Sequence, residues 1–189
     1  MSWYKNLSNK NLTELPPLPL YTSLTFLSCS NNRLTHLPEQ LPNKLTELYC
    51  YNNRLTILPE QLPNSLTHLY CSENRLTRLP EQLSNSLKYL DCSNNRLTRL
   101  PEQLPNTLIR LSCYNNLLTR LPEQLSNSLK YLECYINPFL FYVFKFNCNT
   151  TTSYNNYKVL VGLQRVHSVN FQRKCTYFNR DLNRLCNSF

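Results

Sequence analysis

Residues 44–64 read KLTELYCYNNRLTILPEQLPN, and this 21-residue frame returns in unchanged phase through more than half of the chain. A constant period indicates that each unit is one small supersecondary element, which buries its apolar side by stacking on copies of itself. The sequence therefore predicts a repeat solenoid. The other copies begin at Ser23, Ser65, Ser86, Thr107 and Ser128, and the last breaks off at Pro138.

Each unit divides into two halves with different patterns. In the first half, the Leu-x-x-Leu-x-Cys spacing alternates constant apolar residues with variable ones, which is typical of a β-strand with one buried face. The second half, Leu-Thr-x-Leu-Pro-Glu-Gln-Leu, is too short and too rich in proline for a helix, because proline favours extended backbone around it. We therefore expect one short strand per coil, paired in parallel with its neighbours, and an irregular or polyproline-like return segment.

The chain is expected to form one domain with three regions. Residues 1–22 contain half of a further unit, Leu12–Pro16, and are predicted to form a degenerate N-terminal coil or cap. The array covers residues 23–137. Residues 138–189 are predicted to form a small irregular or helical C-terminal cap with a basic tail, in which the aromatic run Phe139–Phe146 covers the last coil. Seven Lys or Arg residues against one Asp place +6 of the net charge of +9 in this region.

The sequence also indicates a cellular setting. The first six residues lack the apolar core of a secretion signal. The longest apolar run, Phe139–Phe144, is far shorter than the ~20 residues that span a bilayer. We therefore expect a monomeric, intracellular protein of the cytoplasm, without a membrane span and with reduced cysteines.

Cysteine occupies the same position in all six units. Zinc sites need paired ligands at short spacing, and an interval of 21 residues with one nearby histidine, His68, does not supply them. Disulfides between coils would join only isolated pairs in a compartment expected to be reducing. We interpret the column as small buried hydrophobes and expect no metal and no cofactor. The column comprises Cys29, Cys50, Cys71, Cys92, Cys113 and Cys134.

Asparagine forms a second constant column, three residues after each cysteine. A coil turns sharply after its strand, which leaves backbone groups outside the ladder of the sheet. An inward asparagine offers amide donors and an acceptor, so this column is predicted to hydrogen-bond adjacent coils. The column comprises Asn32, Asn53, Asn74, Asn95, Asn116 and Asn137.

Charged residues also recur with the period. We expect a solvated surface on which arginine and glutamate compensate each other. An anion-binding groove is the alternative, and the near-neutral charge of the array disfavours it. The arginines are Arg33, Arg54, Arg75, Arg78, Arg96, Arg99 and Arg120, and the glutamates are Glu39, Glu60, Glu81, Glu102 and Glu123.

A partner is expected to bind at the outward positions around the strands, where the repeat varies. These positions are rich in tyrosine and carry isolated charges, a composition typical of interface hot spots. The alternative is that tyrosine simply suits exposed strands and cross-strand pairs. The predicted partner-binding residues are Phe26, Glu47, Tyr49, Tyr51, His68, Tyr70, Tyr89, Asp91, Arg110, Tyr114, Tyr131, Glu133 and Tyr135.

The frame Leu-x-x-Leu-x-Cys-x-x-Asn-x-Leu-Thr-x-Leu-Pro resembles the leucine-rich repeat, with cysteine in place of the usual third leucine. Its Leu-Pro-Glu arm is similar to the short subclass of bacterial type III effectors. The near-identical, Asn- and Tyr-rich units resemble even more the small leucine-rich repeat proteins of giant amoeba-infecting DNA viruses of the mimivirus type. The resemblance covers residues 12–137 and implies a right-handed, curved solenoid whose concave face binds protein. It implies no particular partner.

The sequence thus favours a non-catalytic protein–protein interaction module, a viral protein acting on host factors through an unidentified protein partner. No catalytic motif is present: the three histidines are scattered, and there is no glycine-rich phosphate loop. One alternative is binding of nucleic acid or an anionic surface by the basic residues 158–186. A ubiquitin-ligase-type effector is a further alternative, disfavoured because residues 138–189 are few and hold no recognisable catalytic cysteine motif.

Overall fold

The computed structural model describes residues 3–18, 23–134, 136–138 and 152–153. The predicted cap segment 139–146 and the basic residues 158–186 therefore lie outside the described residues. Within the described residues, eight strands form one sheet, in sequence order. They are β1 (Tyr4–Asn6), β2 (Phe26–Ser28), β3 (Glu47–Tyr49), β4 (His68–Tyr70), β5 (Tyr89–Asp91), β6 (Arg110–Ser112), β7 (Tyr131–Glu133) and β8 (Thr152–Ser153).

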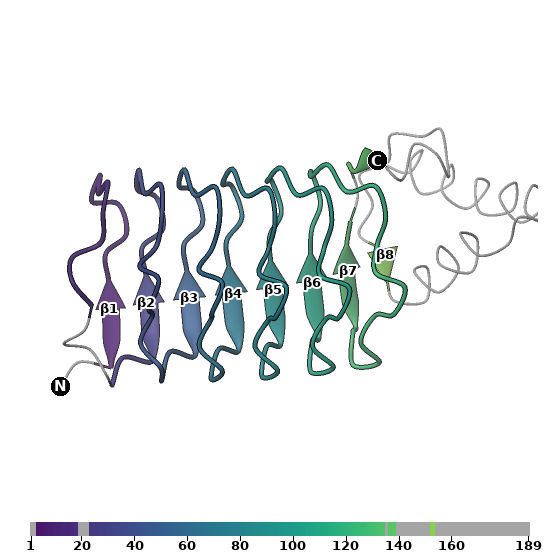
Figure 1. The fold of residues 1–189 in the computed structure, drawn as a ribbon, viewed down its shortest axis with the longest axis horizontal. Coiled ribbons are helices and arrows are strands. Elements are labelled where there is room, and N and C mark those ends of the chain that lie inside the picture. Colours follow the sequence, from purple (N-terminus) through teal and green to yellow (C-terminus); the bar gives the residue numbers. More distant parts are fainter. Residues whose placement is uncertain (1–2, 19–22, 135, 139–151, 154–189) are drawn as a thin grey trace, which may run out of the picture.

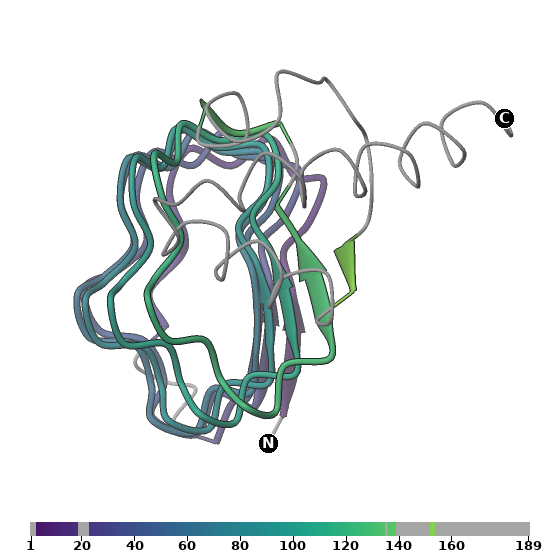
Figure 2. The ribbon, with the colours of Figure 1, turned by 90° about the vertical axis from the view of Figure 1, so that its right-hand side faces the viewer.

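Strands β1 to β7 lie side by side and pair in parallel, each with the strand of the next coil (Figure 1). From β2 onward the pairing follows the repeat, so that Leu48 of β3 pairs with Leu27 on one side and Leu69 on the other. Seen end-on, the coils superimpose, with the strands along one side and the irregular return segments along the other (Figure 2). The predicted parallel-strand solenoid with one short strand per coil is confirmed.

The first coil keeps this architecture with a different offset. Tyr4 pairs with Phe26, 22 residues on, and Lys5 takes the register position of the buried Leu27. Lys5 is half-buried. A charged residue at an inward position of a terminal strand is one of the ways in which sheet edges resist association with other chains.

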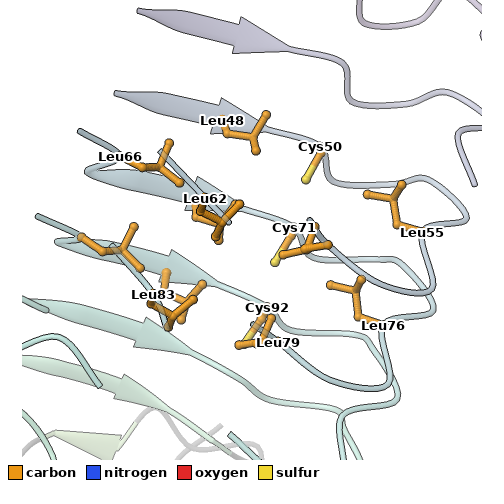
Figure 3. Packing of buried hydrophobic residues seen from close by; sticks show 14 of the residues in the cluster. Leu48, Cys50, Leu55, Leu62, Leu66, Cys71, Leu76, Leu79, Leu83 and Cys92 are labelled. Atoms are coloured by element: carbon orange, nitrogen blue, oxygen red, sulfur yellow. The ribbon is translucent and has the colours of Figure 1, made fainter. Parts of the chain in front are cut away.

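The core consists of leucine and cysteine columns inside the coils (Figure 3). Leu48, Cys50 and Leu55 are fully buried, and their counterparts in the next coil lie beside them. In-register pairing repeats each side chain at one strand spacing, about 4.8 Å. Each inner coil therefore buries its apolar side against equivalent residues on both neighbours, as the period predicts.

The asparagine column closes the turn after each strand. Nδ2 of Asn74 donates to the backbone oxygen of Cys50 in the preceding coil at 3.0 Å and to that of Cys71 in its own coil at 3.2 Å. Its Oδ1 accepts from the backbone N–H of Leu55 at 2.9 Å. The prediction that this column bonds adjacent coils is confirmed. The same contacts recur at Asn53, Asn95 and Asn116.

The residue before that asparagine adopts a left-handed backbone conformation. At Asn52, for example, φ is 50°. Asparagine is among the few non-glycine residues that visit this region routinely, which explains how a chain with one glycine makes so many sharp turns. Glu73 with φ of 52° and Ile136 with φ of 53° break the pattern.

The substitution Glu73→Asn is expected to stabilise the array by roughly 0.5–1 kcal/mol, because asparagine tolerates the left-handed region better than glutamate. Urea unfolding of both proteins measures the difference. Glu39→Asn is the matched control, since Glu39 is not among the residues with positive φ. An equal gain at both positions would contradict the backbone explanation.

The last described strand of the sheet runs in the direction opposite to that of the other strands. Strand β8 pairs antiparallel with β7, with Thr152 opposite Leu132. The polar sequence around residues 149–157 indicates a loop rather than a strand. A strand can nevertheless form here without an apolar pattern, because the backbone N–H and C=O groups at the outer edge of β7 can hydrogen-bond to any extended segment. In the part of the chain that the structure describes, no helix is long and apolar enough to cross a membrane.

Candidate protein-binding face

The outward residues of the strands lie on one side of the sheet, here called the strand face, although Ser28 and Ser112 are themselves buried. It consists of the first and third residues of β1–β7, which flank the middle residue of each strand. Because the strands are in register, these residues form two parallel columns across the sheet. The first column is Tyr4, Phe26, Glu47, His68, Tyr89, Arg110 and Tyr131, and the second is Asn6, Ser28, Tyr49, Tyr70, Asp91, Ser112 and Glu133.

Rings from the first five strands stack in a continuous row, here called the aromatic ladder. It begins with Tyr4 and Phe26 in the first column, continues with Tyr49 and Tyr70 in the second, and ends with His68 and Tyr89 in the first. The spacings are typical of packed aromatic pairs. The ring centroids are separated by 4.3 Å for Tyr4–Phe26, 5.1 Å for Phe26–Tyr49, 4.6 Å for Tyr49–Tyr70, 6.3 Å for Tyr70–His68 and 4.5 Å for His68–Tyr89.

The ladder unites five of the residues predicted from the sequence and adds Tyr4, which sequence reasoning missed. Tyr4 stacks on Phe26 with an angle of 13° between the ring planes. The 22-residue offset of the first coil hides this register, because an alignment on the 21-residue period puts Lys5 opposite Phe26. Allowing for one inserted residue between β1 and β2 would have found it.

The charged residues of the strand face are held by local bonds. Oε2 of Glu47 accepts from the Tyr49 hydroxyl at 3.2 Å. Oδ1 of Asp91 accepts from the backbone N–H of Ser93 at 3.1 Å and from its hydroxyl at 2.6 Å. Beyond the ladder, Arg110 forms an ion pair with Glu133, with 2.9 Å between Nη2 and Oε1. The face thus has an aromatic part over β1–β5 and an ion pair between β6 and β7.

Two tyrosine hydroxyls of the ladder are held in the protonated form. Burial, reinforced by the carboxylate of Glu47, raises the pKa of Tyr49 to about 12. Burial also raises the pKa of Tyr70, with the carboxylates of Glu47 and Asp91 acting in the same direction and Arg110 opposing them. Both hydroxyls therefore remain hydrogen-bond donors at neutral pH.

The position after each cysteine is more buried than the sequence predicts. Tyr51 and Tyr114 are half-buried, and the serines of the same column, Ser72 and Ser93, are buried. The chain already turns there, since the next residue has a left-handed backbone. Tyr51 and Tyr114 consequently flank the strand face, and the predicted Tyr135 lies outside the described residues. The remaining predicted residue of β7, Tyr131, is exposed.

The six cysteines of the array are buried and free. Burial raises the pKa of Cys29 and Cys134 to about 12 and holds the pKa of the four thiols between them well above the usual value. Uncharged thiols are poor nucleophiles and poor metal ligands, so the structure supports the interpretation as small hydrophobes. Within the described ranges, no group of three or more His, Cys, Asp or Glu residues could hold a metal ion.

The stability of the array is expected to fall steeply above pH 9. The pKa of a buried thiol such as Cys71 is higher in the folded protein than the ordinary value of 9.0 in the unfolded chain. Its contribution to stability is therefore fully present below pH 9 and is lost as the pH rises, because the unfolded chain then releases its proton first. In this range, each buried thiol lowers the free energy of unfolding by up to about 1.4 kcal/mol per pH unit. Urea titrations of the native protein and of Cys71→Val from neutral to alkaline pH measure it. The variant should have the shallower slope, and identical slopes would contradict the explanation.

On the opposite side of the coils, an open groove follows the return segments. Arg78 pairs with Glu60 and Arg99 with Glu81, each at 2.6 Å, and Arg120 pairs with Glu102 in the same way. These pairs confirm part of the predicted charge compensation. Exposed pairs contribute only about 0–1 kcal/mol each. The groove is lined by the segments 39–43, 60–64, 81–85, 102–106 and 123–127, together with 15–18, Pro38 and Lys44.

Fold and sequence place this array in the leucine-rich repeat class. Residues 64–106 match a family model described as "Leucine Rich repeats (2 copies)", and residues 23–43 and 44–64 each match one described as "Leucine Rich Repeat". A comparison with curated proteins found no match. The predicted leucine-rich repeats and their solenoid are thus confirmed, and this fold is typically a non-catalytic scaffold.

Solved structures of bacterial proteins are similar to this chain. YopM from Yersinia enterocolitica is 39% identical with a TM-score of 0.67, over 72% of this chain and 29% of that one. The leucine-rich repeat domain of a Shigella effector is 36% identical with a TM-score of 0.65, over 72% of this chain and 59% of that one. This chain therefore spans less than two thirds of either. InlJ from Listeria monocytogenes, whose domain "includes a cysteine ladder", shares the fold at 24% identity, a TM-score of 0.51 and coverage of 72% and 40%.

Proposed function

We propose that this protein is a non-catalytic interaction module that binds a partner protein on the strand face. The observation that carries the proposal is the aromatic ladder, in which rings of five adjacent strands form one row on the outside of the sheet. Tyrosine combines a large apolar area with a polar tip at low conformational cost, and it is enriched at the centres of protein interfaces.

The solenoid itself does not require these rings. Strand β6 carries Arg110 and Ser112 at the two outward positions, yet it pairs with β5 and β7 in the same register as the other strands. Stacked cross-strand pairs contribute about 0.2–1 kcal/mol each, whereas each coil buries several leucines completely. Strand pairing therefore does not need a ring in every coil, which favours a role in binding over a purely structural one.

The proposal includes a setting. We infer an intracellular, monomeric factor that acts on proteins of a host cytoplasm, and the similarity to a Shigella effector supports an action of this kind. The short Leu-Pro-Glu subclass and an origin in a giant virus remain predictions from the sequence. Proteomic detection of the native protein in infected cells, after fractionation, would test the setting.

The interaction is tested by affinity capture from a cell lysate. The bait is the full chain, compared with a variant in which Tyr49, Tyr70 and Tyr89 of the strand face are all changed to serine. The control changes Gln40, Gln61 and Gln82 in the groove to serine, which alters as many residues on the opposite side. We expect partners that the control retains and the tyrosine variant loses, as quantified by mass spectrometry. Equal recovery with both variants would refute binding through the strand face.

A further inference from the structure

The aromatic ladder presents ring edges and hydroxyls rather than ring faces. Tyr49 and Tyr70 stack with 29° between their planes, and His68 and Tyr89 stack with 11°. In each of these pairs the two ring faces that oppose each other are covered, which leaves ring edges and hydroxyls as contact points. Ring edges carry the positive end of the aromatic quadrupole, and the protonated hydroxyl of Tyr70 can donate to a ligand, whereas that of Tyr49 donates to Glu47. Such a row suits hydrogen-bond acceptors, such as the backbone carbonyls of a peptide.

Two carboxylates, Glu47 and Asp91, flank this row. The outward positions of β2–β7 hold three carboxylates against one guanidinium, and Arg110 is paired with Glu133. Neither Glu47 nor Asp91 forms an ion pair among the residues that the structure describes. This part of the face is thus acidic, in a chain whose formal net charge is +9. An acidic patch on a basic protein attracts cations and repels polyanions.

The spacing of the two carboxylates limits the geometry of a ligand. Glu47 is the first residue of β3 and Asp91 the last residue of β5, two strands further on. Two strand spacings and a shift of two residues put their Cα atoms about 12 Å apart. In an extended peptide, residues four apart lie on the same side and are separated by about 13 Å. Two basic side chains at that spacing would reach both carboxylates.

On the basis of the function proposed above, we infer that the strand face over β3–β5 binds an extended, basic segment of the partner protein. Two Lys or Arg side chains, four residues apart, pair with Glu47 and Asp91. The peptide carbonyls between them accept from the hydroxyl of Tyr70 and contact the ring edges of the ladder. The bonds from Tyr49 and Ser93 hold the two carboxylates in place before binding, which reduces the entropic cost of pairing them.

The test measures fluorescence anisotropy of labelled peptides with the full chain. One peptide carries two arginines four residues apart in a Gly/Ser/Tyr background, and the other carries two glutamates at the same positions. We expect the arginine peptide to bind at least about tenfold more tightly, with an affinity that falls as salt is added. Equal affinity for the glutamate peptide, or displacement of the arginine peptide from this face by a single-stranded oligonucleotide, would overturn the inference.

Two charge-matched variants locate the binding. Glu47→Gln with Asp91→Asn keeps both acceptors but removes two charges, and it should weaken the arginine peptide by about tenfold. Glu39→Gln with Glu123→Gln removes two charges from the groove and should change the affinity less than about twofold. An equal loss in both variants would mean that only net charge is sensed, and the inference would fail.

The same variants separate this inference from the function on which it rests. If the captured partners are lost by the tyrosine variant but retained by Glu47→Gln with Asp91→Asn, the strand face is an interface and the basic segment is wrong. If both variants retain every partner, the proposed function itself fails. Urea unfolding of each variant ensures that a loss of binding does not reflect a loss of fold.

Discussion

Replacing Asn74 with alanine is expected to destabilise the array by about 3 kcal/mol, the upper end of the range for leaving buried polar groups unpaired. The side chain hydrogen-bonds three backbone carbonyls and the N–H of Leu55. Alanine offers no replacement, and the site is largely closed to solvent, since Asn74 itself is only 9% exposed. Unfolding in urea, followed by circular dichroism, measures the loss.

Thr77→Ala is the control for this prediction. Thr77 lies in the same coil on the exposed surface, and its truncation should change the free energy of unfolding by less than about 0.5 kcal/mol. A loss at Asn74 no larger than that of the control would mean that the asparagine column is not what connects the coils.

Replacing Leu69 with alanine is expected to cost about 3–4 kcal/mol, because truncation of a fully buried leucine removes apolar contacts and leaves a cavity. Leu69 is 0% exposed and lies between Leu48 and Leu90, its register partners in the neighbouring coils. A rigid backbone ladder on both sides limits how far the site can collapse. The measurement is again the free energy of unfolding in urea.

Leu117→Ala provides the matched comparison. This leucine is 50% exposed, so the same chemical change should cost well under about 1 kcal/mol. Comparable losses at Leu69 and Leu117 would show that burial between coils does not govern the effect of leucine substitutions here.

The sequence predicts the architecture well because the determinants of a solenoid are local and repeated. Leu27 and Leu48 are in register because every unit has the same length, and an inward asparagine has few ways to satisfy a turn other than the one seen at Asn74. The left-handed turn residue was not predicted, although Asn52 and its equivalents carry the signal. Glu73 hides that signal, since glutamate at this position suggests no special backbone.

The strand face could be predicted only in part. The alternation within Leu-x-x-Leu-x-Cys points Tyr49 and Tyr70 outward, and the structure confirms both positions. Whether outward rings stack depends on rotamers and on neighbours one coil away, which the period alone does not give. For this reason the link between the columns through His68 and the contribution of Tyr4 appear only in three dimensions.

The central claim is that a partner binds the aromatic ladder, and one titration tests it most directly. Isothermal titration of the captured partner into the native chain and into Tyr70→Ser compares the two affinities. Tyr70 is central to the ladder, and loss of an interface anchor typically costs about 2 kcal/mol or more. We expect at least a tenfold weaker complex with Tyr70→Ser and an unchanged complex with Gln61→Ser in the groove. An unchanged affinity with Tyr70→Ser would contradict this prediction, whatever the effect of Gln61→Ser.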